Sequence, residues 1–381
     1  MGLKYQSSSE SALQSSQQSG AVVDELTEIS VQEGEESESK TASFSGKFQY
    51  LVTRVVRFLC SVPWLMYGIY LVTFGGILYL AGISLFLPRY LFGLDEVLRP
   101  VAEWLVWYSG VPMVLGFAFA LFDFFVLFER KRAHRAYREE DMNGAKVTVA
   151  LTAYNDEESI VAAVEDFIAH PRVERVIVVS NNSSDETFER AVKAGAVTFN
   201  ELQPGYGRCV YRCYSEALKS GAELIVLCEG DRTFRAADID KLLSFAPHAD
   251  IVNGTRIVEM LRERNTQLST FMYYGNLFVA KLLEAKHLGR ATLTDVGSTY
   301  KLIRADALRK LMPKLDPSVN LPFNAHFMDM ALANETSLIE CPITFHPRVG
   351  VSKGGNTNNA RAMAVGFGMM RGVTFGWENA K

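Results

Sequence analysis

The pattern of hydrophobic and polar positions changes twice along the chain. Residues 1–46 are rich in Ser, Gln and Glu and almost devoid of aromatic residues. Such a segment buries too little apolar surface to offset the entropy lost on ordering, so we expect a disordered acidic tail. Two long apolar runs follow, at about residues 58–87 and 101–128, and short apolar stretches then alternate with helical segments.

The two apolar runs predict a transmembrane hairpin. Each is longer than the roughly 20 apolar residues that a helix needs to cross a bilayer. No charged side chain interrupts the first run. The second has Glu103 near its start and Asp123 near its end, and we expect Asp123 to lie near the lipid headgroups or to pair within the hairpin. The alternative is a buried hairpin of a soluble protein.

Basic residues around the hairpin predict its orientation. Three precede the first run and five lie between residues 130 and 138, whereas the connection carries two that are offset by Asp95 and Glu96. Because basic flanks stay in the cytoplasm, both termini and everything after residue 130 should be cytoplasmic, at a bacterial inner membrane or the endoplasmic reticulum. We predict a basic linker helix over residues 130–144, which completes a hairpin region of residues 47–144.

Residues 145–355 alternate between short apolar stretches and helical segments, which predicts an α/β fold. The mainly parallel, Rossmann-like sheet would be flanked by helices and bind ligands at the carboxyl ends of its strands. An apolar helix over residues 266–288 fits either the core or the membrane interface. The Met-, Phe- and Gly-rich tail of residues 356–381 is a second candidate for contact with lipid. The predicted strands cover residues 147–152, 175–180, 197–200, 224–228 and 250–253, and the predicted helices cover 156–169, 186–194 and 208–220.

An acidic motif follows the predicted strand at residues 224–228. Glu229-Gly230-Asp231 brings two carboxylates close together at the strand's end. Two such groups repel each other unless a cation lies between them, and carboxylate oxygens favour hard cations such as Mg²⁺ or Mn²⁺. A cation held there would bind a diphosphate. The alternative is a polar turn with both carboxylates in solvent.

Composition narrows the choice of partners. The formal net charge of −4 gives no indication of nucleic-acid binding. The five cysteines are scattered and lack the paired spacing of a zinc site. We therefore interpret them as reduced thiols in a cytosolic or membrane setting.

Short motifs follow one another in a fixed order along the predicted α/β domain. They are LTAYNDEESI (151–160), SNNSSDET (180–187), EGD (229–231), NGTR (253–256), DVGSTYK (295–301), FMDM (327–330), ECPI (340–343) and RVGVSK (348–353). These motifs resemble those of family 2 glycosyltransferases of the GT-A fold, within the branch of dolichyl-phosphate mannose synthases and bacterial polyprenyl-phosphate glycosyltransferases. The chain departs from the family pattern at Ser180 and Glu229, where Asp is usual, at Lys301, where Arg is usual, and at Asp329, where Glu is usual. Its hairpin also precedes the catalytic domain, whereas many relatives carry their membrane helices after it.

The resemblance implies a role for particular residues. Glu229 and Asp231 would hold a divalent metal, and Asp231, Asp329 and Arg348 would act in catalysis. Residues that would bind the donor are Ala153, Tyr154, Glu157, Asn181, Asp185, Glu229, Gly230 and Arg256. Residues that would bind the acceptor or its phosphate are Asp295, Lys301, Arg348, Ser352 and Lys353.

The implied activity is an inverting transfer of a sugar from a UDP- or GDP-linked donor to a polyprenyl phosphate at the cytoplasmic membrane face. An acceptor phosphate is already anionic and needs no general base. A hydroxyl acceptor would need one, for which Asp329 is the candidate, unless that carboxylate only orients a basic side chain. The alternatives are a transferase that extends a lipid-linked or exported glycan and a catalytically degenerate membrane scaffold. A homo-oligomer remains open.

Overall fold

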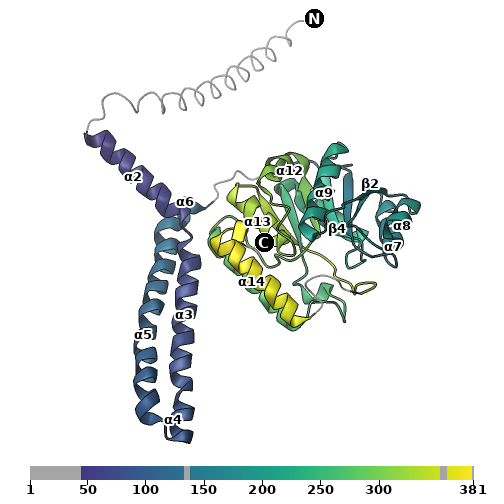
Figure 1. The fold of residues 1–381 in the computed structure, drawn as a ribbon. Coiled ribbons are helices and arrows are strands. Elements are labelled where there is room, and N and C mark those ends of the chain that lie inside the picture. The colour runs from purple at the N-terminus through teal and green to yellow at the C-terminus, as the bar shows by residue number, and fades with distance from the viewer. Residues whose placement is uncertain (1–43, 133–137, 352–357, 380–381) are drawn as a thin grey trace, which may run out of the picture. The chain divides into compact units, whose positions relative to one another are not determined.

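The computed structural model describes residues 44–132, 138–351 and 358–379 (Figure 1). Residues 1–43 of the predicted tail lie outside the described residues. Residues 44–46 begin a helix, so the disorder predicted for them is wrong. The chain divides into two compact units, residues 1–62 and residues 63–381.

The first unit contains one described helix, α2 (Phe44–Ser61). It ends just before Val62-Pro63, where the proline lacks an N–H and disfavours the helical conformation in the residue before it. α3 (Trp64–Ser84) begins immediately afterwards. The predicted span of residues 58–87 is therefore wrong at its start, because the apolar run is divided between two helices.

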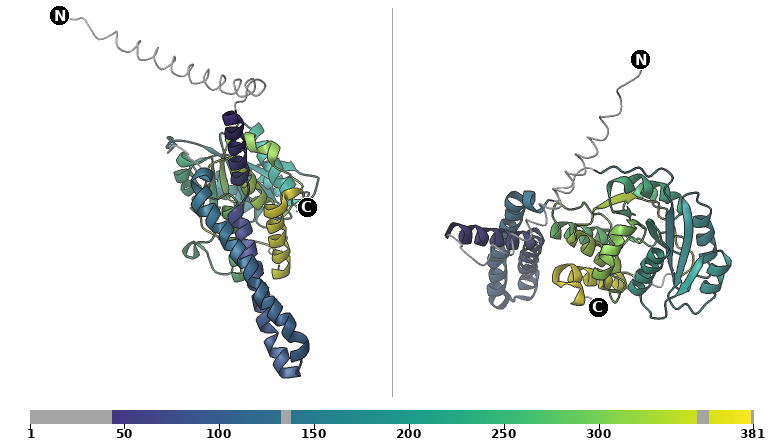
Figure 2. Two further views of the ribbon diagram at one scale, coloured as in Figure 1. Left: turned by 90° about the vertical axis from the view of Figure 1, so that its left-hand side faces the viewer. Right: turned by 90° about the horizontal axis from the view of Figure 1, so that it is seen from above.

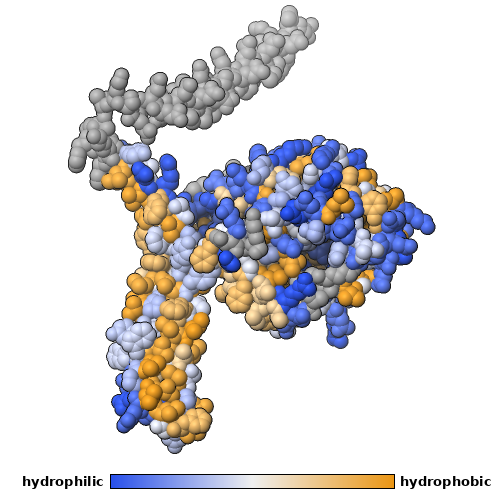
Figure 3. Space-filling view, viewed as in Figure 1, coloured by the Kyte–Doolittle hydropathy of each residue, from blue (hydrophilic) through white to orange (hydrophobic). Residues whose placement is uncertain are grey.

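Two helical stretches, Trp64–Phe92 and Asp95–Lys131, are long and apolar enough to cross a membrane. Only 11% and 17% of their most apolar windows are buried, so the soluble alternative, in which a core hairpin would be covered, is disfavoured. Their surface is largely apolar, whereas the surface of the α/β domain is largely hydrophilic (Figure 3). The elements of the two stretches are α3, α4 (Phe86–Phe92), α5 (Asp95–Phe122), the π-helix η2 (Asp123–Leu127) and α6 (Phe128–Lys131).

Small residues let α3 and α5 approach each other closely. Gly68, Gly75 and Gly82 recur every seventh residue on α3 and are buried. A Cβ atom added at Gly68 would lie 2.6 Å from the carbonyl oxygen of Gly116 on α5. Close backbone contact of this kind is how helices associate where lipid removes the hydrophobic drive between them.

Asp123 pairs within the hairpin, as one of the two sequence predictions proposed. Its carboxylate is fully buried and forms an ion pair with Lys131, with 2.6 Å between Nζ and Oδ1. Its Oδ2 accepts a hydrogen bond of 2.9 Å from the backbone N–H of Leu65 in the first turn of α3. Because the first N–H groups of a helix have no partner within the helix, Asp123 caps α3 from the neighbouring chain segment.

The linker helix predicted over residues 130–144 is wrong in the part that the structure describes. α6 ends at Lys131, and residues 138–146 form turns and irregular backbone. Arg138 forms ion pairs with Glu140 and with Asp250 of the α/β domain, and Glu140 pairs with Arg304. The ion pairs with Asp250 and Arg304 hold this segment against the domain, and it forms no local helix.

The α/β domain contains a seven-stranded sheet in the order β3-β2-β1-β4-β6-β5-β7. All neighbouring strands run parallel except β6, which is antiparallel to both β4 and β5. This is the mainly parallel sheet that the sequence predicted. The strands are β1 (Val147–Ala153), β2 (Val173–Ser180), β3 (Val197–Asn200), β4 (Leu224–Glu229), β5 (Ile251–Thr255), β6 (Lys301–Arg304) and β7 (Leu338–Pro342).

Helices cover both faces of the sheet (Figure 2). Successive strand residues point to opposite faces, so Val149 and Leu151 of β1 join one hydrophobic core and Ala150 joins the other. The helices are α7 (Ile160–Ile168), α8 (Thr187–Lys193), α9 (Tyr206–Lys219), α10 (Ile239–Phe245), α11 (Thr270–Lys286), α12 (Ala305–Leu311), α13 (Phe323–Ala333) and α14 (Asn359–Phe375). Single-turn 3-10 helices lie between them at Ala236–Asp238, Ala246–His248, Glu259–Leu261 and Met312–Lys314, with the last at Trp377–Asn379.

α11 and α14 pack against each other and carry exposed apolar side chains. One side of α11 is buried, with Val279 and Leu283 in the core, while Tyr274 is 64% exposed. The predicted apolar helix is therefore both a core helix and a partly exposed one. On α14, Thr374 is hydrogen-bonded to the hydroxyl of Tyr70 on α3 at 2.5 Å.

Candidate active site

The carboxyl ends of β1, β2 and β4 meet at one edge of the sheet. In the strand register Ala153 lies opposite Ser180, and Thr152 lies opposite Glu229. Asn181 N–H donates to the carbonyl of Ala153 at 2.8 Å, and Gly230 N–H donates to the carbonyl of Thr152 at 2.9 Å. The three motifs that follow these strands in the sequence are therefore brought together, as predicted.

The first two of these loops are joined to each other by side chains. Asp185 accepts hydrogen bonds from Thr187 Oγ1 at 2.5 Å and from the N–H of Glu157 at 3.3 Å. The carboxylate of Glu157 in turn accepts from the N–H of Glu186 at 3.3 Å. Asp185 and Glu157 thus hold the loops in place, and neither lines the cavity described next.

A cavity of about 750 Å³ opens at this edge of the sheet. Its polar part is formed by strand ends and the loops after them, and its apolar part by α11 and α14. The main polar residues are Tyr154, Asp156, Asn181, Glu229, Asp231, Arg256 and Arg348. The main apolar residues are Phe271, Met272, Phe278, Met363, Phe367 and Met370.

Asp231 lies buried in the polar part, only 1% exposed. Its Oδ1 accepts from the N–H and the hydroxyl of Thr233 at 3.0 and 2.6 Å, and its Oδ2 lies 2.9 Å from Nη1 of Arg348. Burial, and then the negative charge of Glu229, raise the pKa of Asp231 to about 7 even though Arg348 opposes this. The pair of carboxylates is therefore short of positive charge.

Arg348 connects two of the strand-end loops. Besides Asp231, its guanidinium contacts Asp156 Oδ1 through Nη2 at 2.6 Å. Burial would lower the pKa of Arg348, but the charges of Asp231 and Asp156 raise it above the usual value. The backbone adds a further tie, since the N–H of Val349 donates to the carbonyl of Asp231 at 3.1 Å.

Three residues that the sequence did not single out orient Glu229. Its Oε1 accepts a hydrogen bond of 2.5 Å from Thr299 Oγ1, which lies 2.8 Å from the hydroxyl of Tyr206. Asn324 Nδ2 donates to the same Tyr206 hydroxyl at 3.0 Å. The motif at residues 295–301 marked the segment that contains Thr299, but only the folded chain shows that its hydroxyl reaches Glu229. This chain of hydrogen bonds directs the longer arm of the Glu-for-Asp variant.

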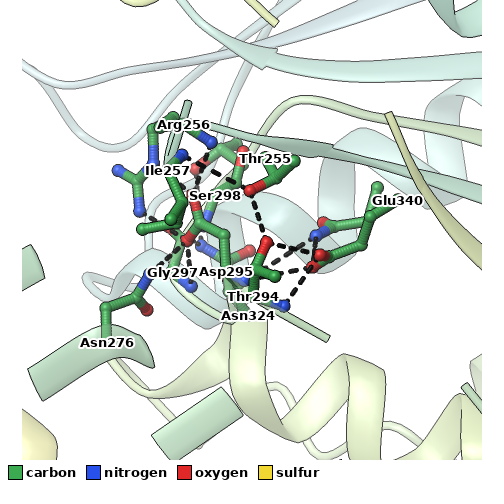
Figure 4. Close-up of polar contacts among 12 residues, drawn as sticks. Thr255, Arg256, Ile257, Asn276, Thr294, Asp295, Gly297, Ser298, Asn324 and Glu340 are labelled. Carbon is green, nitrogen blue, oxygen red and sulfur yellow. Dashed lines mark hydrogen bonds and ion pairs between the residues drawn. The ribbon is translucent and has the colours of Figure 1, made fainter. Parts of the chain in front are cut away.

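Arg256 is held at the cavity by Asp295 (Figure 4). Its Nε and Nη2 donate to the two carboxylate oxygens at 2.7 and 2.8 Å, and Asn276 of α11 donates to Oδ1 at 2.6 Å. Burial alone would raise the pKa of Asp295, but Arg256 outweighs it and the pKa is lowered to about 2. Asp295 is fully buried and does not line the cavity, so it acts through Arg256.

Lys301 is also fully buried, in the antiparallel strand β6. Its Nζ donates to the carbonyl of Ser298 and lies 3.5 Å from Asn324 Oδ1. Burial lowers the pKa of Lys301 to about 7. Since it does not line the cavity, the structure gives no support to the phosphate contact expected for it.

Asp329 lies on α13, outside the cavity lining, and is fully buried. Its carboxylate accepts from Lys286 Nζ at 2.8 Å and Trp377 Nε1 at 2.7 Å, and His287 Nε2 lies 2.6 Å away. Burial alone would raise the pKa of Asp329, but the hydrogen bond to His287 and the charge of Lys286 lower it below its usual value. Of the two roles weighed for Asp329, this favours the one in which it orients basic side chains.

The remaining predicted residues either line the cavity, lie next to it or fall outside the described residues. Ala153 lines the cavity at the end of β1, together with Tyr154 and Asn181. Gly230 does not line it, and a Cβ atom there would lie 2.7 Å from Cδ1 of Ile160, so the position suits glycine. Ser352 and Lys353 lie outside the described residues.

The carboxylate oxygens of Glu229 and Asp231 suit a divalent metal only if the substrate supplies further ligands to it. Among the described residues, no group of three or more His, Cys, Asp or Glu side chains is placed to hold a metal ion. Glu229 and Asp231 nevertheless offer hard oxygen ligands with excess negative charge. One or two carboxylates completed by substrate phosphates are a usual site for Mg²⁺.

Sequence comparisons relate the chain to glycosyltransferases, although no protein-family profile matches it. It is 35% identical over 116 residues to an uncharacterized glycosyltransferase of Mycobacterium tuberculosis, a match that covers 30% of this chain and 50% of the relative. It is 27% identical over 210 residues to a dolichyl-phosphate hexose transferase of Haloferax volcanii, covering 54% and 86%. It is 25% identical over 217 residues to an undecaprenyl-phosphate mannosyltransferase of Micrococcus luteus, covering 55% and 87%. The chain thus spans only half the length of the mycobacterial relative.

Among solved structures, the chain is similar to glucosyl-3-phosphoglycerate synthase of Mycobacterium tuberculosis, crystallised with Mn²⁺, UDP and phosphoglyceric acid. The sequences are 15% identical, the match covers 64% of this chain and 84% of the synthase, and the TM-score is 0.45.

Proposed function

We propose that this protein transfers a sugar from a nucleotide-sugar donor to a polyprenyl phosphate at the cytoplasmic face of a membrane. The observation that carries the proposal is the division of one cavity into a charged part at the strand ends and an apolar part between α11 and α14. A nucleoside diphosphate suits the first part and a lipid chain suits the second. The names of the Haloferax and Micrococcus relatives, a dolichyl-phosphate hexose transferase and an undecaprenyl-phosphate mannosyltransferase, support a polyprenyl phosphate as the acceptor.

The donor would bind in the charged part. Arg256 and Arg348 present guanidinium groups there, and both are held in place by buried carboxylates. Fixed positive charge stabilises the diphosphate as the bond to the sugar breaks and negative charge builds up on the leaving group. A bound Mg²⁺ or Mn²⁺ at Glu229 and Asp231 would neutralise further charge on the same diphosphate.

The acceptor would enter along α11 and α14. Phe271, Phe278, Met363 and Phe367 of these helices are between 43% and 60% exposed and line the cavity. The same two helices pack near α3, the first helix of the hairpin. An isoprenoid chain lying against them would bring its phosphate toward the charged part of the cavity.

The chemistry then needs no general base. An anionic phosphate oxygen of the acceptor attacks the anomeric carbon from the face opposite the diphosphate, and the carbon–oxygen bond to the diphosphate breaks. The configuration is inverted and the nucleoside diphosphate leaves. This agrees with the position of Asp329, which is engaged with Lys286 and Trp377 and does not line the cavity.

The test uses the full-length protein in lipid nanodiscs with UDP- and GDP-linked sugars, a short polyprenyl phosphate, and Mg²⁺ or Mn²⁺. We expect one donor to yield a lipid-linked sugar, and Asp231→Asn to lower the rate by roughly 10²–10³-fold. Asp306→Asn on the exposed surface of α12 is the matched control and should leave the rate unchanged.

Calorimetric binding of the nucleoside diphosphate gives an independent readout. Asp231→Asn should abolish the dependence of this binding on the metal. If no donor is consumed with either metal, the proposed activity is wrong, and if Asp231→Asn turns over normally, the metal assignment is wrong. Product from an oligosaccharide acceptor but none from a polyprenyl phosphate would favour the glycan-extending alternative.

A further inference from the structure

α2 immediately precedes the hairpin in the sequence, and one of its faces is apolar and exposed. With about 3.6 residues per turn, Leu51, Val52, Val55 and Phe58 fall on one side of the helix. Their exposed fractions run from 43% to 63%. These four residues span about two turns, so α2 is amphipathic over residues 51–58.

The opposite face of α2 is basic. Arg54 and Arg57 are exposed there, and the whole helix contains no Asp or Glu. Three exposed polar or amphipathic side chains, those of Gln49, Tyr50 and Thr53, complete this face. A helix with an apolar stripe and a polar face whose charged residues are all basic has the composition of segments that lie in the plane of an anionic membrane surface.

Chain connectivity supports the same placement. Only Val62 and Pro63 separate α2 from α3, and two residues span at most about 7 Å. α3 begins with Trp64, and tryptophan is enriched at the level of the lipid headgroups. If the hairpin crosses a membrane, the end of α2 must therefore lie at the interface, while Arg54 and Arg57 would be costly inside the hydrocarbon.

We infer that α2 lies along the cytoplasmic surface of the membrane, with Leu51, Val52, Val55 and Phe58 in the acyl region and Arg54 and Arg57 on anionic headgroups. α2 is then an interfacial anchor that precedes the hairpin, distinct from the two spans. The inference depends on the hairpin crossing a membrane and does not depend on the proposed enzymatic activity.

The experiment measures how deeply each face of α2 lies in the bilayer. Single cysteines replace Val55 on the apolar face or Thr53 on the basic face of the full-length protein, with Cys60→Ser to remove the partly exposed native thiol nearby. Each is labelled with an environment-sensitive fluorophore in nanodiscs of phosphatidylcholine and phosphatidylglycerol that contain acyl-brominated lipid. The Cys60→Ser protein without an added cysteine measures labelling of the remaining native thiols.

We expect bromine to quench the label at V55C about threefold more than the label at T53C. Equal quenching at the two positions would overturn the inference. Crosslinking of V55C between copies without quenching would also overturn it, because the apolar face would then pair with a second chain.

A separate experiment tests whether Arg54 and Arg57 bind anionic headgroups. Omitting phosphatidylglycerol should reduce quenching at V55C, and the double variant Arg54→Gln/Arg57→Gln should remove this dependence on lipid charge. An unchanged dependence would refute the role of the two arginines. Hydrogen exchange of residues 49–61 in the unlabelled protein provides a readout without substitutions, and it should be slower in the anionic nanodiscs than in detergent.

Discussion

Replacing Asp329 distinguishes an anchoring carboxylate from a catalytic one. Asp329 is completely buried, and three donor groups converge on it from Lys286, His287 and Trp377. Asp329→Asn keeps the volume of the side chain and removes its charge. Because Trp377 lies immediately after α14, the anchor ties the end of that cavity-lining helix to α11 and α13.

The expected loss of stability follows from these contacts. Removing one partner of a buried ion pair costs about 3–5 kcal/mol, because the other charge is left uncompensated. The side chain of Lys286 is 23% exposed and regains some solvation, which places the expected loss near the lower end, at about 3 kcal/mol. Trp377→Phe removes a hydrogen bond to the buried carboxylate and replaces the indole by a smaller ring, and the lost hydrogen bond alone should cost about 1.5–3 kcal/mol.

Denaturant unfolding in detergent, compared with the rate of sugar transfer per folded molecule, is the assay. Asp306→Asn on exposed α12 is the control and should change stability by less than about 0.5 kcal/mol. An anchoring role predicts a large loss of stability with kcat within a few-fold of the parent. Unchanged stability with a loss of about 10²–10⁴-fold in kcat would refute the reasoning and identify Asp329 as a general base.

The contacts of Asp329 also make the free energy of unfolding depend on pH. The folded-state pKa of Asp329 lies below its usual value, so its contribution to stability is present above about pH 4 and is lost as the pH falls through the folded pKa. Asp329→Asn should therefore flatten the acid limb of the stability profile, which unfolding experiments below pH 5 can measure.

Three further predictions concern packing and protonation. Burial lowers the pKa of His326 to about 4, so below pH 6.5 the unfolded chain binds a proton that the folded chain does not. The free energy of unfolding should therefore fall by up to about 3 kcal/mol between pH 6.5 and 4. His326→Gln should remove this pH dependence, as unfolding curves can measure. Gly116→Leu should separate α3 from α5, because a Cβ atom would lie 2.6 Å from the carbonyl oxygen of Gly68, and faster proteolysis of the hairpin would report it. Gly207→Ala should lower the thermal midpoint by several degrees, because its Cβ would lie 2.0 Å from the carbonyl oxygen of Val319; an unchanged midpoint would show that the 319 segment moves freely.

The local pattern of apolar and polar residues was enough to predict the first four strands of the sheet. β3 was predicted over its full length, and β1, β2 and β4 within one or two residues of their ends. β1 and β4 are continuous apolar runs because both of their faces are buried, and such a run can be recognised in the sequence without knowledge of the fold. The helix boundary at Pro63 was missed, because the composition is apolar on both sides of it.

Long-range pairing places two charged segments in surroundings that the sequence did not indicate. Residues 130–144 were predicted to form a basic linker helix, but Arg138 and Glu140 have partners at Asp250 and Arg304 in the domain. Lys301 has the charge of a phosphate ligand, yet it lies in a strand with neighbours on both sides. A sequence records that a side chain is charged and leaves open whether it faces solvent, a ligand or another buried group.

The motif Glu229-Gly230-Asp231 shows which properties of the site are determined by the local sequence and which by the tertiary structure. Its residue types and its place after an apolar strand were enough to predict paired carboxylates at the sheet edge, because strand length and polarity are local properties. Only the folded chain brings Arg348 against Asp231 and Thr299 against Glu229, from segments about 120 and 70 residues away, respectively. These contacts orient both carboxylates, and burial together with the neighbouring charges sets the pKa of Asp231. Both effects depend on distances through space, which no short stretch of the chain encodes.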